Sequence, residues 1–217
     1  MTIASWYDDH IVPRFIKCAC SAPGIMELRA QLVPRAQGKV FEIGCGGGFN
    51  QRFYDATQIS SYAGIDPSAK GLDYAREEAA KKGWNADLRQ GSGEDIPFAA
   101  DSFDTVVCTY TLCSVSDQAQ VLAELRRILK PAGRLLFLEH GRAPDAGVAK
   151  WQDRIEPVWK RLSGGCHLAR PVSSAVAGSG LSVTPLGQRY LPKTPRFAGW
   201  MEWGEGTKVD SGSKQMN

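Results

Sequence analysis

Short apolar runs alternate with longer segments of helical periodicity over most of this chain. The apolar runs, which predict buried strands, lie at residues 40–43, 62–65, 105–109 and 134–138, and the more polar segment 86–90 is expected to form a further strand. Between them, residues 69–82 place Leu72, Ala75 and Ala79 on one helical face, and residues 117–129 repeat apolar side chains at helical spacing. Strands that alternate with helices predict an α/β fold with a mostly parallel, doubly wound sheet and a binding site at its carboxyl edge.

The first part of the chain does not follow this alternation. Residues 1–34 predict a helical arm, in which Pro13 and the sequence Ala22-Pro23-Gly24 separate two short helices. Such an arm either caps the open end of the sheet or packs against the side of the domain.

Beyond residue 140 the pattern changes again. Residues 149–162 form an amphipathic segment in which Pro157 is expected at a break or kink. A short helix is expected at 171–177, and two further strands at 181–190 and 197–203 bring the predicted sheet to seven strands. The main domain is therefore expected to span residues 35–204, and residues 205–217, rich in Gly, Ser and Lys, to form a flexible tail.

The first predicted strand ends in a glycine-rich turn, Glu42-Ile43-Gly44-Cys45-Gly46-Gly47-Gly48. Glycines at the end of a buried strand let the backbone approach a ligand closely. Residues 49–54 should then begin the first crossover helix, and Ser116 should cap the helix at 117–129. The turn lacks the third glycine of a dinucleotide site, since Phe49 stands there, and it lacks the lysine of a P-loop.

An acidic residue, Asp66, ends the second predicted strand about 20 residues after the turn, where adenosine-binding α/β units place the acceptor for the ribose hydroxyls. Three further motifs follow in order: Gly91-Ser92-Gly93-Glu94 after the third strand, Phe103-Asp104 before the fourth, and Lys130-Pro131-Ala132-Gly133 after the next helix.

This ordered set resembles the class I S-adenosylmethionine (SAM) dependent methyltransferases. The resemblance implies a Rossmann-like seven-stranded sheet with an N-terminal helical cap, and SAM as cofactor. The implied cofactor-binding residues lie at successive strand ends: Glu42, Gly44, Cys45, Gly46, Gly48 and Asn50; Asp66 and Pro67; Ser92, Gly93 and Glu94; Cys108 and Thr109. Whether Ser92, Glu94 or the backbone recognises the adenine stays open.

Later residues carry a closer resemblance. Residues 106–115, Leu138-Glu139-His140, the tryptophan-rich segment and Gly164-Gly165-Cys166-His167-Leu168-Ala169-Arg170 are similar to the small thiol S-methyltransferases. The similarity covers about residues 38–190 and implies transfer of a methyl group to a small thiol, such as methanethiol or hydrogen sulfide. Those relatives carry an N-terminal membrane anchor that this sequence does not show, which favours a small soluble acceptor. A quinone, a phospholipid amine or another small metabolite is the alternative acceptor, and a non-catalytic SAM-binding protein is the alternative class.

A thiol with a pKa near 8.5 needs a base or a nearby cation to become a thiolate. The candidates are His140 at the end of the fifth strand, His10 in the arm, and His167 beside Arg170. For His140 a structural hydrogen-bonding role is the alternative. The candidate acceptor contacts are Tyr7, Trp151 and Arg154, although tryptophans at such positions more often pack than bind.

Composition narrows the remaining choices. The 217 residues are 43% hydrophobic and 23% charged, and the net charge of +3 gives no reason to expect nucleic-acid binding. The sequence shows neither a signal peptide nor an apolar span of membrane length, so we expect a cytoplasmic enzyme. The six cysteines include no zinc-like spacing, which predicts buried thiols and no metal site.

Overall fold

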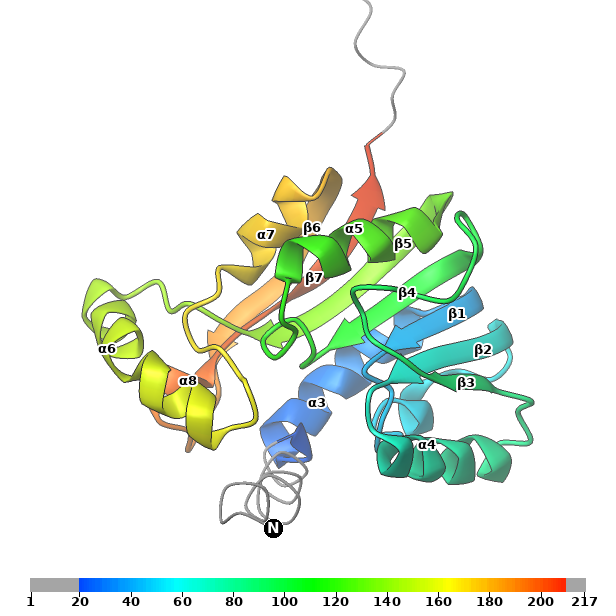
Figure 1. The fold of residues 1–217 in the computed structure, drawn as a ribbon, viewed down its shortest axis with the longest axis horizontal. Helices are drawn as coiled ribbons and strands as arrows, with labels where there is room; N and C mark the ends of the chain where they lie inside the picture. Colours follow the sequence, from blue (N-terminus) through cyan, green and yellow to red (C-terminus); the bar gives the residue numbers. More distant parts are fainter. Residues whose placement is uncertain (1–19, 210–217) are drawn as a thin grey trace, which may run out of the picture.

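A computed structural model describes residues 20–209 of the chain. Its centre is a seven-stranded sheet with the order β3-β2-β1-β4-β5-β7-β6 (Figure 1). The strands are β1 (Gly38–Ile43), β2 (Ile59–Asp66), β3 (Asp87–Gln90), β4 (Phe103–Thr109), β5 (Leu129–His140), β6 (Leu181–Tyr190) and β7 (Trp200–Lys208). Strands β1 to β5 pair in parallel, and β7 runs antiparallel between β5 and β6. The predicted fold class is confirmed.

Helices cover both faces of the sheet because successive strand residues point to opposite sides. On one face, Phe41 and Ile43 pack in a cluster with residues of α5 (Gln118–Ile128) and α7 (Val172–Gly178). On the other face, Val40 packs with residues of α3 (Pro23–Leu32) and α4 (Ala69–Lys81). Two further described helices, α6 (Ala146–Leu162) and α8 (Arg196–Gly199), lie beside each other, and α8 lies where β6 ends and β7 begins (Figure 1).

The described part of the N-terminal arm packs against the domain. Leu28 and Leu32 of α3 are completely buried in the second cluster, and the 3₁₀ turn η1 (Val33–Arg35) leads into β1. Tyr7 and His10, the two candidate site residues in the arm, lie outside the described residues.

The first crossover contradicts the sequence expectation. In place of a helix beginning at residues 49–54 there is a 3₁₀ turn, η2 (Gln51–Phe53), and Tyr54 already has extended backbone. The reason is that the side chains here point inwards and bond to the protein interior. Gln51 Nε2 donates to the carbonyl of Ala75 at 2.9 Å, and Tyr54 OH donates to Glu42 at 2.7 Å.

Several element boundaries also differ from the predictions. Asp117, not Ser116, caps α5, accepting from the backbone N–H of Gln120 at 3.0 Å. The Lys130–Gly133 segment belongs to β5, which begins at Leu129. Helix α6 continues through Pro157.

The last strand lies later in the chain than predicted, at Trp200–Lys208 instead of 197–203. Residues 205–208, expected in a flexible tail, are part of it because both neighbours offer partners: Thr207 pairs with Arg134 of β5 and with Ser182 of β6. An interior strand position of this kind satisfies backbone groups on both sides.

Candidate functional site

A cavity of about 450 Å³ opens at the carboxyl ends of β1, β2 and β4, the place that a parallel α/β sheet offers to a ligand. One part of its lining comes from the predicted motifs: Gly44, Gly46, Asp66, Pro67, Ser92, Gly93, Glu94 and Thr109. The other part includes residues that were not predicted: Cys20, Arg29, Phe49, Tyr110, Thr111, Ser114 and Gly164.

The glycine turn and the acid of β2 are in direct contact. Gly44 has a φ of +67°, a left-handed conformation that favours glycine. At Gly46 the constraint is space, since an added Cβ would lie 2.5 Å from Oδ2 of Asp66. The backbone of the turn therefore reaches the cavity at a place where no side chain fits.

Asp66 presents its carboxylate to the cavity. Oδ2 accepts from the backbone N–H of Gly46 and Oδ1 from that of Ser68, each at 2.8 Å. Burial raises the pKa of Asp66, and these two hydrogen bonds act in the opposite direction. Each oxygen keeps one lone pair, so the carboxylate is able to accept from two neighbouring hydroxyl groups.

The segment after β3 is fastened to the loop after β4. Glu94 Oε1 accepts from the backbone N–H groups of Ser116 and Asp117 at 3.0 and 3.1 Å, and Ser92 donates to Oε2. Desolvation alone would raise the pKa of Glu94, but these hydrogen bonds lower it. The Glu94 carboxylate is thus largely used in closing this side of the cavity.

Glu42 lies beneath the turn and outside the cavity lining. It is 2% exposed and accepts hydrogen bonds from Asn50 Nδ2 at 2.9 Å, Tyr54 OH at 2.7 Å and Tyr62 OH at 2.8 Å. Burial raises its pKa, against these bonds. Of the predicted cofactor residues, Cys45, Gly48, Asn50 and Cys108 are also outside the lining. Among them, Asn50 bonds to Glu42 on the buried side of the turn, whereas Cys108 donates to Glu139 of β5.

Sequence reasoning missed Arg29, a buried cation that lines the cavity. Its Nη1 donates to Asn50 Oδ1 at 2.5 Å and to Thr109 Oγ1 at 2.6 Å, while its buried Nε has no partner among residues 20–209. The guanidinium also lies 5.5 Å from the ring centre of Tyr110. The available signal was its position on the apolar face of α3, among Ile25, Leu28 and Leu32.

The loop after β4 forms one wall of the cavity and is held by two charged side chains. Glu139 Oε1 accepts from the backbone N–H groups of Thr111 and Leu112 at 2.7 and 3.1 Å. Arg170 donates to the carbonyls of Leu112 and Val115. Arg170, named with His167 as a candidate for activating the thiol, therefore contacts the backbone of this loop, and it does not line the cavity.

His140 lies behind that wall and is 8% exposed. Its Nε2 is 3.0 Å from Sγ of Cys166, and Cys113 belongs to the same cluster. A hydrogen bond with Cys113 and the charge of His140 lower the pKa of Cys166 despite burial. Burial alone would lower the pKa of His140, but the neighbouring Cys166 raises it. The Nε2 atom of His140 therefore contacts a thiol of the protein, and His140 does not line the cavity.

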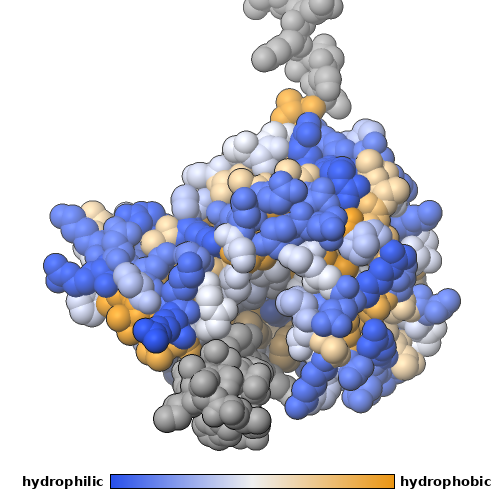
Figure 2. Space-filling model, in the orientation of Figure 1, coloured by the Kyte–Doolittle hydropathy of each residue, from blue (hydrophilic) through white to orange (hydrophobic). Residues whose placement is uncertain are grey.

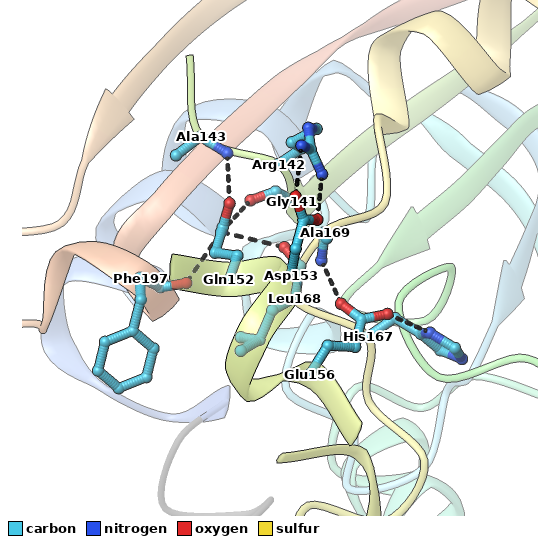
Figure 3. Close-up of polar contacts among 10 residues, drawn as sticks. All are labelled: Gly141, Arg142, Ala143, Gln152, Asp153, Glu156, His167, Leu168, Ala169 and Phe197. Carbon is cyan, nitrogen blue, oxygen red and sulfur yellow. Dashed lines mark hydrogen bonds and ion pairs between the residues drawn. The ribbon is translucent and has the colours of Figure 1, made fainter. Parts of the chain in front are cut away.

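His167 does not line the cavity, and its side chain pairs with Glu156 of α6 (Figure 3). Its Nδ1 is 2.8 Å from Oε1 of Glu156, and Oε2 of that carboxylate accepts from the backbone N–H of Ala169 at 2.8 Å. Buried Gln152 makes a second attachment, donating to the carbonyls of Gly141 and Leu168 at 3.0 and 3.1 Å. Helix α6 therefore fixes the loop at residues 163–170.

The outer side of α6 carries the two remaining candidates. Trp151 is 49% exposed and Arg154 is exposed, and neither lines the cavity. Val158 and Leu162 are also exposed on this helix, and Figure 2 shows apolar surface beside polar surface in the region of α6.

Comparisons with known proteins agree with this architecture. Residues 41–137 match the family described as "Methyltransferase domain". The chain is 34% identical over 173 residues to the thiol S-methyltransferase TMT1B of Rattus norvegicus, covering 74% of this chain and 68% of that protein. It is 36% identical over 90 residues to the ubiquinone/menaquinone biosynthesis C-methyltransferase UbiE of Hahella chejuensis, covering 41% of this chain and 36% of that protein. The crystal structure of the YcgJ protein of Bacillus subtilis superposes with a TM-score of 0.70 at 19% identity, covering 85% of this chain and 98% of that one.

The cavity has the features that a SAM site requires. The glycine turn allows close backbone approach, Asp66 offers paired acceptors, and buried Arg29 offers a positive charge. The carboxylate of Asp66 suits the ribose diol of SAM, and the cation of Arg29 suits the carboxylate of its amino-acid part. The chain belongs to the class I SAM-dependent methyltransferases, and SAM is its methyl donor.

Proposed function

We propose that this enzyme methylates the sulfur of a small thiol, such as methanethiol or hydrogen sulfide. The observation that carries the proposal is the extent of the likeness to the thiol S-methyltransferase. It spans 173 residues, whereas the general methyltransferase family matches residues 41–137 alone. The likeness to the thiol S-methyltransferase thus covers more of this chain than the general family does.

The roles of the cofactor-side residues follow from their positions. Asp66 accepts from the ribose hydroxyls, and Gly44 and Gly46 let the backbone approach the amino-acid part of the donor. Arg29, the buried cation of the cavity lining, pairs with the carboxylate of that part. Ser92 and the backbone at Gly93 face the adenine, because the Glu94 carboxylate is engaged with Ser116 and Asp117.

The opposite side of the cavity receives the acceptor. Its lining there includes Cys20, Tyr110, Ser114 and Gly164. When bound, SAM supplies a methyl group carried on a positively charged sulfur. The enzyme's task is to align the acceptor sulfur with that group and to exclude water. The bond between the acceptor sulfur and the methyl carbon forms as the bond from that carbon to the sulfonium breaks, and the thiol proton is released.

Two alternatives remain from the sequence. A quinone or another small metabolite as acceptor is supported by the likeness to the quinone C-methyltransferase, but that likeness is limited to 90 residues. A non-catalytic SAM-binding role has less support, because the cavity extends past the cofactor motifs to Cys20, Tyr110 and Gly164. That extension provides room for a second ligand.

An acceptor panel tests the proposal. Purified protein is incubated with SAM and, separately, with hydrogen sulfide, small alkyl thiols, a catechol, a reduced quinone and primary amines. Methylated products are measured by mass spectrometry, with Asp66→Ala as the control for enzyme-dependent turnover. We expect products from the sulfur acceptors only. Turnover of the quinone or an amine without any sulfur product would refute the thiol assignment, and cofactor binding without any product would support the non-catalytic role.

The cellular setting is a separate question. Among residues 20–209, the helices are too short or too polar to cross a bilayer. The cytoplasmic location and the lack of a nucleic-acid partner stay predictions from composition.

A further inference from the structure

Three side chains with soft ligand atoms meet behind the cavity wall. Cys113 lies in the loop after β4, His140 is the last residue of β5, and Cys166 lies in the loop after α6. Their ligand atoms all lie within 4.8 Å of one another, and His140 Nε2 is 3.0 Å from Cys166 Sγ. The sequence predicted no metal site, because these residues lie on three separate segments and form no recognisable spacing.

The spacing of these atoms suits a metal ion. In a tetrahedral zinc site, bonds of about 2.3 Å to sulfur and about 2.0 Å to nitrogen place the ligand atoms roughly 3.5–3.8 Å apart. The three atoms here need only small side-chain rotations to reach that arrangement. Two thiolates and one imidazole are also a donor set that zinc prefers.

We propose that Cys113, His140 and Cys166 bind one zinc ion whose fourth coordination position takes the sulfur of the acceptor thiol. The second half of this proposal rests on the proposed function. Three protein ligands with an open fourth position are typical of catalytic zinc sites, whereas structural sites have four.

The surrounding structure holds the two cysteine ligands in place. The backbone N–H of Cys113 faces Oε2 of Glu139 at 3.4 Å, and the carbonyl of Cys113 accepts from the backbone N–H of His167 at 2.7 Å. The loop that carries Cys166 is fixed to α6 by Glu156 (Figure 3). Outer contacts of this kind orient metal ligands and reduce the cost of assembling the site.

The cluster also adjoins the acceptor side of the cavity. Ser114, next to Cys113, and Gly164, near Cys166 in the chain, both line the cavity. The ring of Tyr110, another lining residue, lies 6.1 Å from the ring of His140. A sulfur atom held at the cluster would therefore lie beside the cavity and would not be enclosed in the core.

Coordination would solve the problem of activating the thiol. As the metal–sulfur bond forms, the thiol proton leaves to solvent, and the acceptor reacts as a metal-bound thiolate. The new sulfur–methyl bond then replaces the methyl–sulfonium bond. The neutral product, a thioether from an alkyl thiol or methanethiol from hydrogen sulfide, is a weaker ligand than the thiolate and leaves the metal. The metal does not change its oxidation state, and no protein base is needed.

Metal content tests the site itself. Protein purified under reducing conditions is loaded with Zn²⁺ and, separately, with Co²⁺, and metal per chain is measured by mass spectrometry together with the thiolate-to-cobalt charge-transfer absorption. We expect about one ion per chain, and loss of the ion and of the absorption in Cys113→Ser, His140→Ala and Cys166→Ser. Cys108→Ser is the matched control, because this buried thiol lies outside the cluster, and it should retain both signals. Circular dichroism identifies any variant that fails to fold and therefore cannot be compared with the wild type. In that case the thermal midpoint of the wild-type protein is measured with and without Zn²⁺, and we expect Zn²⁺ to raise it.

Some results would overturn the site. These are a wild-type protein that binds neither ion, equal loss of metal in Cys108→Ser, or a Cys113–Cys166 disulfide in metal-free protein purified under reducing conditions. Retention of metal by all three cluster variants would also exclude it.

A second measurement tests the open position. Adding a small thiol to the Co²⁺ protein should strengthen the charge-transfer absorption, and Cys108→Ser should not change this response, since Cys108 neither belongs to the cluster nor lines the cavity. If adding thiols does not change the spectrum, the metal does not bind the acceptor. If metal-free protein methylates thiols at the full rate, the zinc proposal fails and the proposed function stands. If the spectrum responds to thiols and none is methylated, the proposed function fails and the metal site stands.

Discussion

The backbone N–H of Gly46 donates to Oδ2 of Asp66 at 2.8 Å. This contact joins the glycine turn after β1 to the acid that ends β2. The turn is therefore more than a flexible approach to the cofactor, because it positions and partly neutralises the carboxylate expected to bind the ribose.

Gly46→Ala should disrupt this contact. The new Cβ would lie 2.5 Å from Oδ2, so either the turn or the carboxylate must move. We expect SAM affinity, measured by calorimetry, to fall by about tenfold or more, equivalent to about 1.4 kcal/mol. Gly147→Ala is the matched control, since an added Cβ there meets no atom within 4 Å. Unchanged affinity in Gly46→Ala would contradict the close packing of turn and acid.

Asp66 should make SAM binding depend on pH. Burial raises the pKa of this carboxyl, and only the ionised form offers all its lone pairs to the ribose hydroxyls. Affinity should therefore be full at neutral pH and fall as the pH decreases through the raised pKa, towards about pH 4. Asp66→Ala should weaken binding at neutral pH by about 1–3 kcal/mol, and Asp66→Asn should remove most of the pH dependence. Calorimetric titrations at several pH values provide the measurement, and a wild-type profile that matches that of Asp66→Asn would exclude the role.

Arg29→Met should weaken binding of the amino-acid part of the cofactor. We expect S-adenosylhomocysteine to lose about tenfold or more in affinity, since a charge-assisted contact contributes about 1.5–3 kcal/mol. Binding of 5′-methylthioadenosine, which lacks the carboxylate, should change much less. Arg35→Met serves as control, because Arg35 pairs with Glu205 and does not line the cavity. Equal losses for both ligands would indicate that Arg29 only supports the fold.

Glu139→Ala should destabilise the loop after β4. It leaves the buried backbone N–H groups of Thr111 and Leu112 without their acceptor. We expect the free energy of unfolding in urea to fall by about 2–4 kcal/mol. Asp73→Ala, which removes an exposed ion pair with Arg76, should change stability by less than about 0.5 kcal/mol. A similar stability for both variants would show that Glu139 does not hold the loop.

The cofactor half of the site could be predicted because its information is local. Each motif directly follows one strand, and in a parallel sheet the ends of neighbouring strands meet at one edge. Gly44, Gly46, Asp66, Ser92 and Thr109 therefore came together at the cavity as expected. The same local signals wrongly predicted a helix at η2. The inward hydrogen bonds of Gln51 and Tyr54, which replace it, go to Ala75 and Glu42 outside that segment.

The acceptor side depends on contacts between distant segments that have no common sequence pattern. From residue type alone, His167 and Arg170 were candidates for activating the thiol. In the folded chain His167 instead pairs with Glu156, and Arg170 binds the loop after β4. Packing also brings Arg29 from the arm to the cavity and gathers Cys113, His140 and Cys166 from three elements. By itself, the sequence determined the fold class and the cofactor motifs, since apolar periodicity and turn residues act over a few positions. Only the tertiary structure decided which polar side chains meet, because their partners are chosen by how helices α3 and α6 pack against the sheet and its loops.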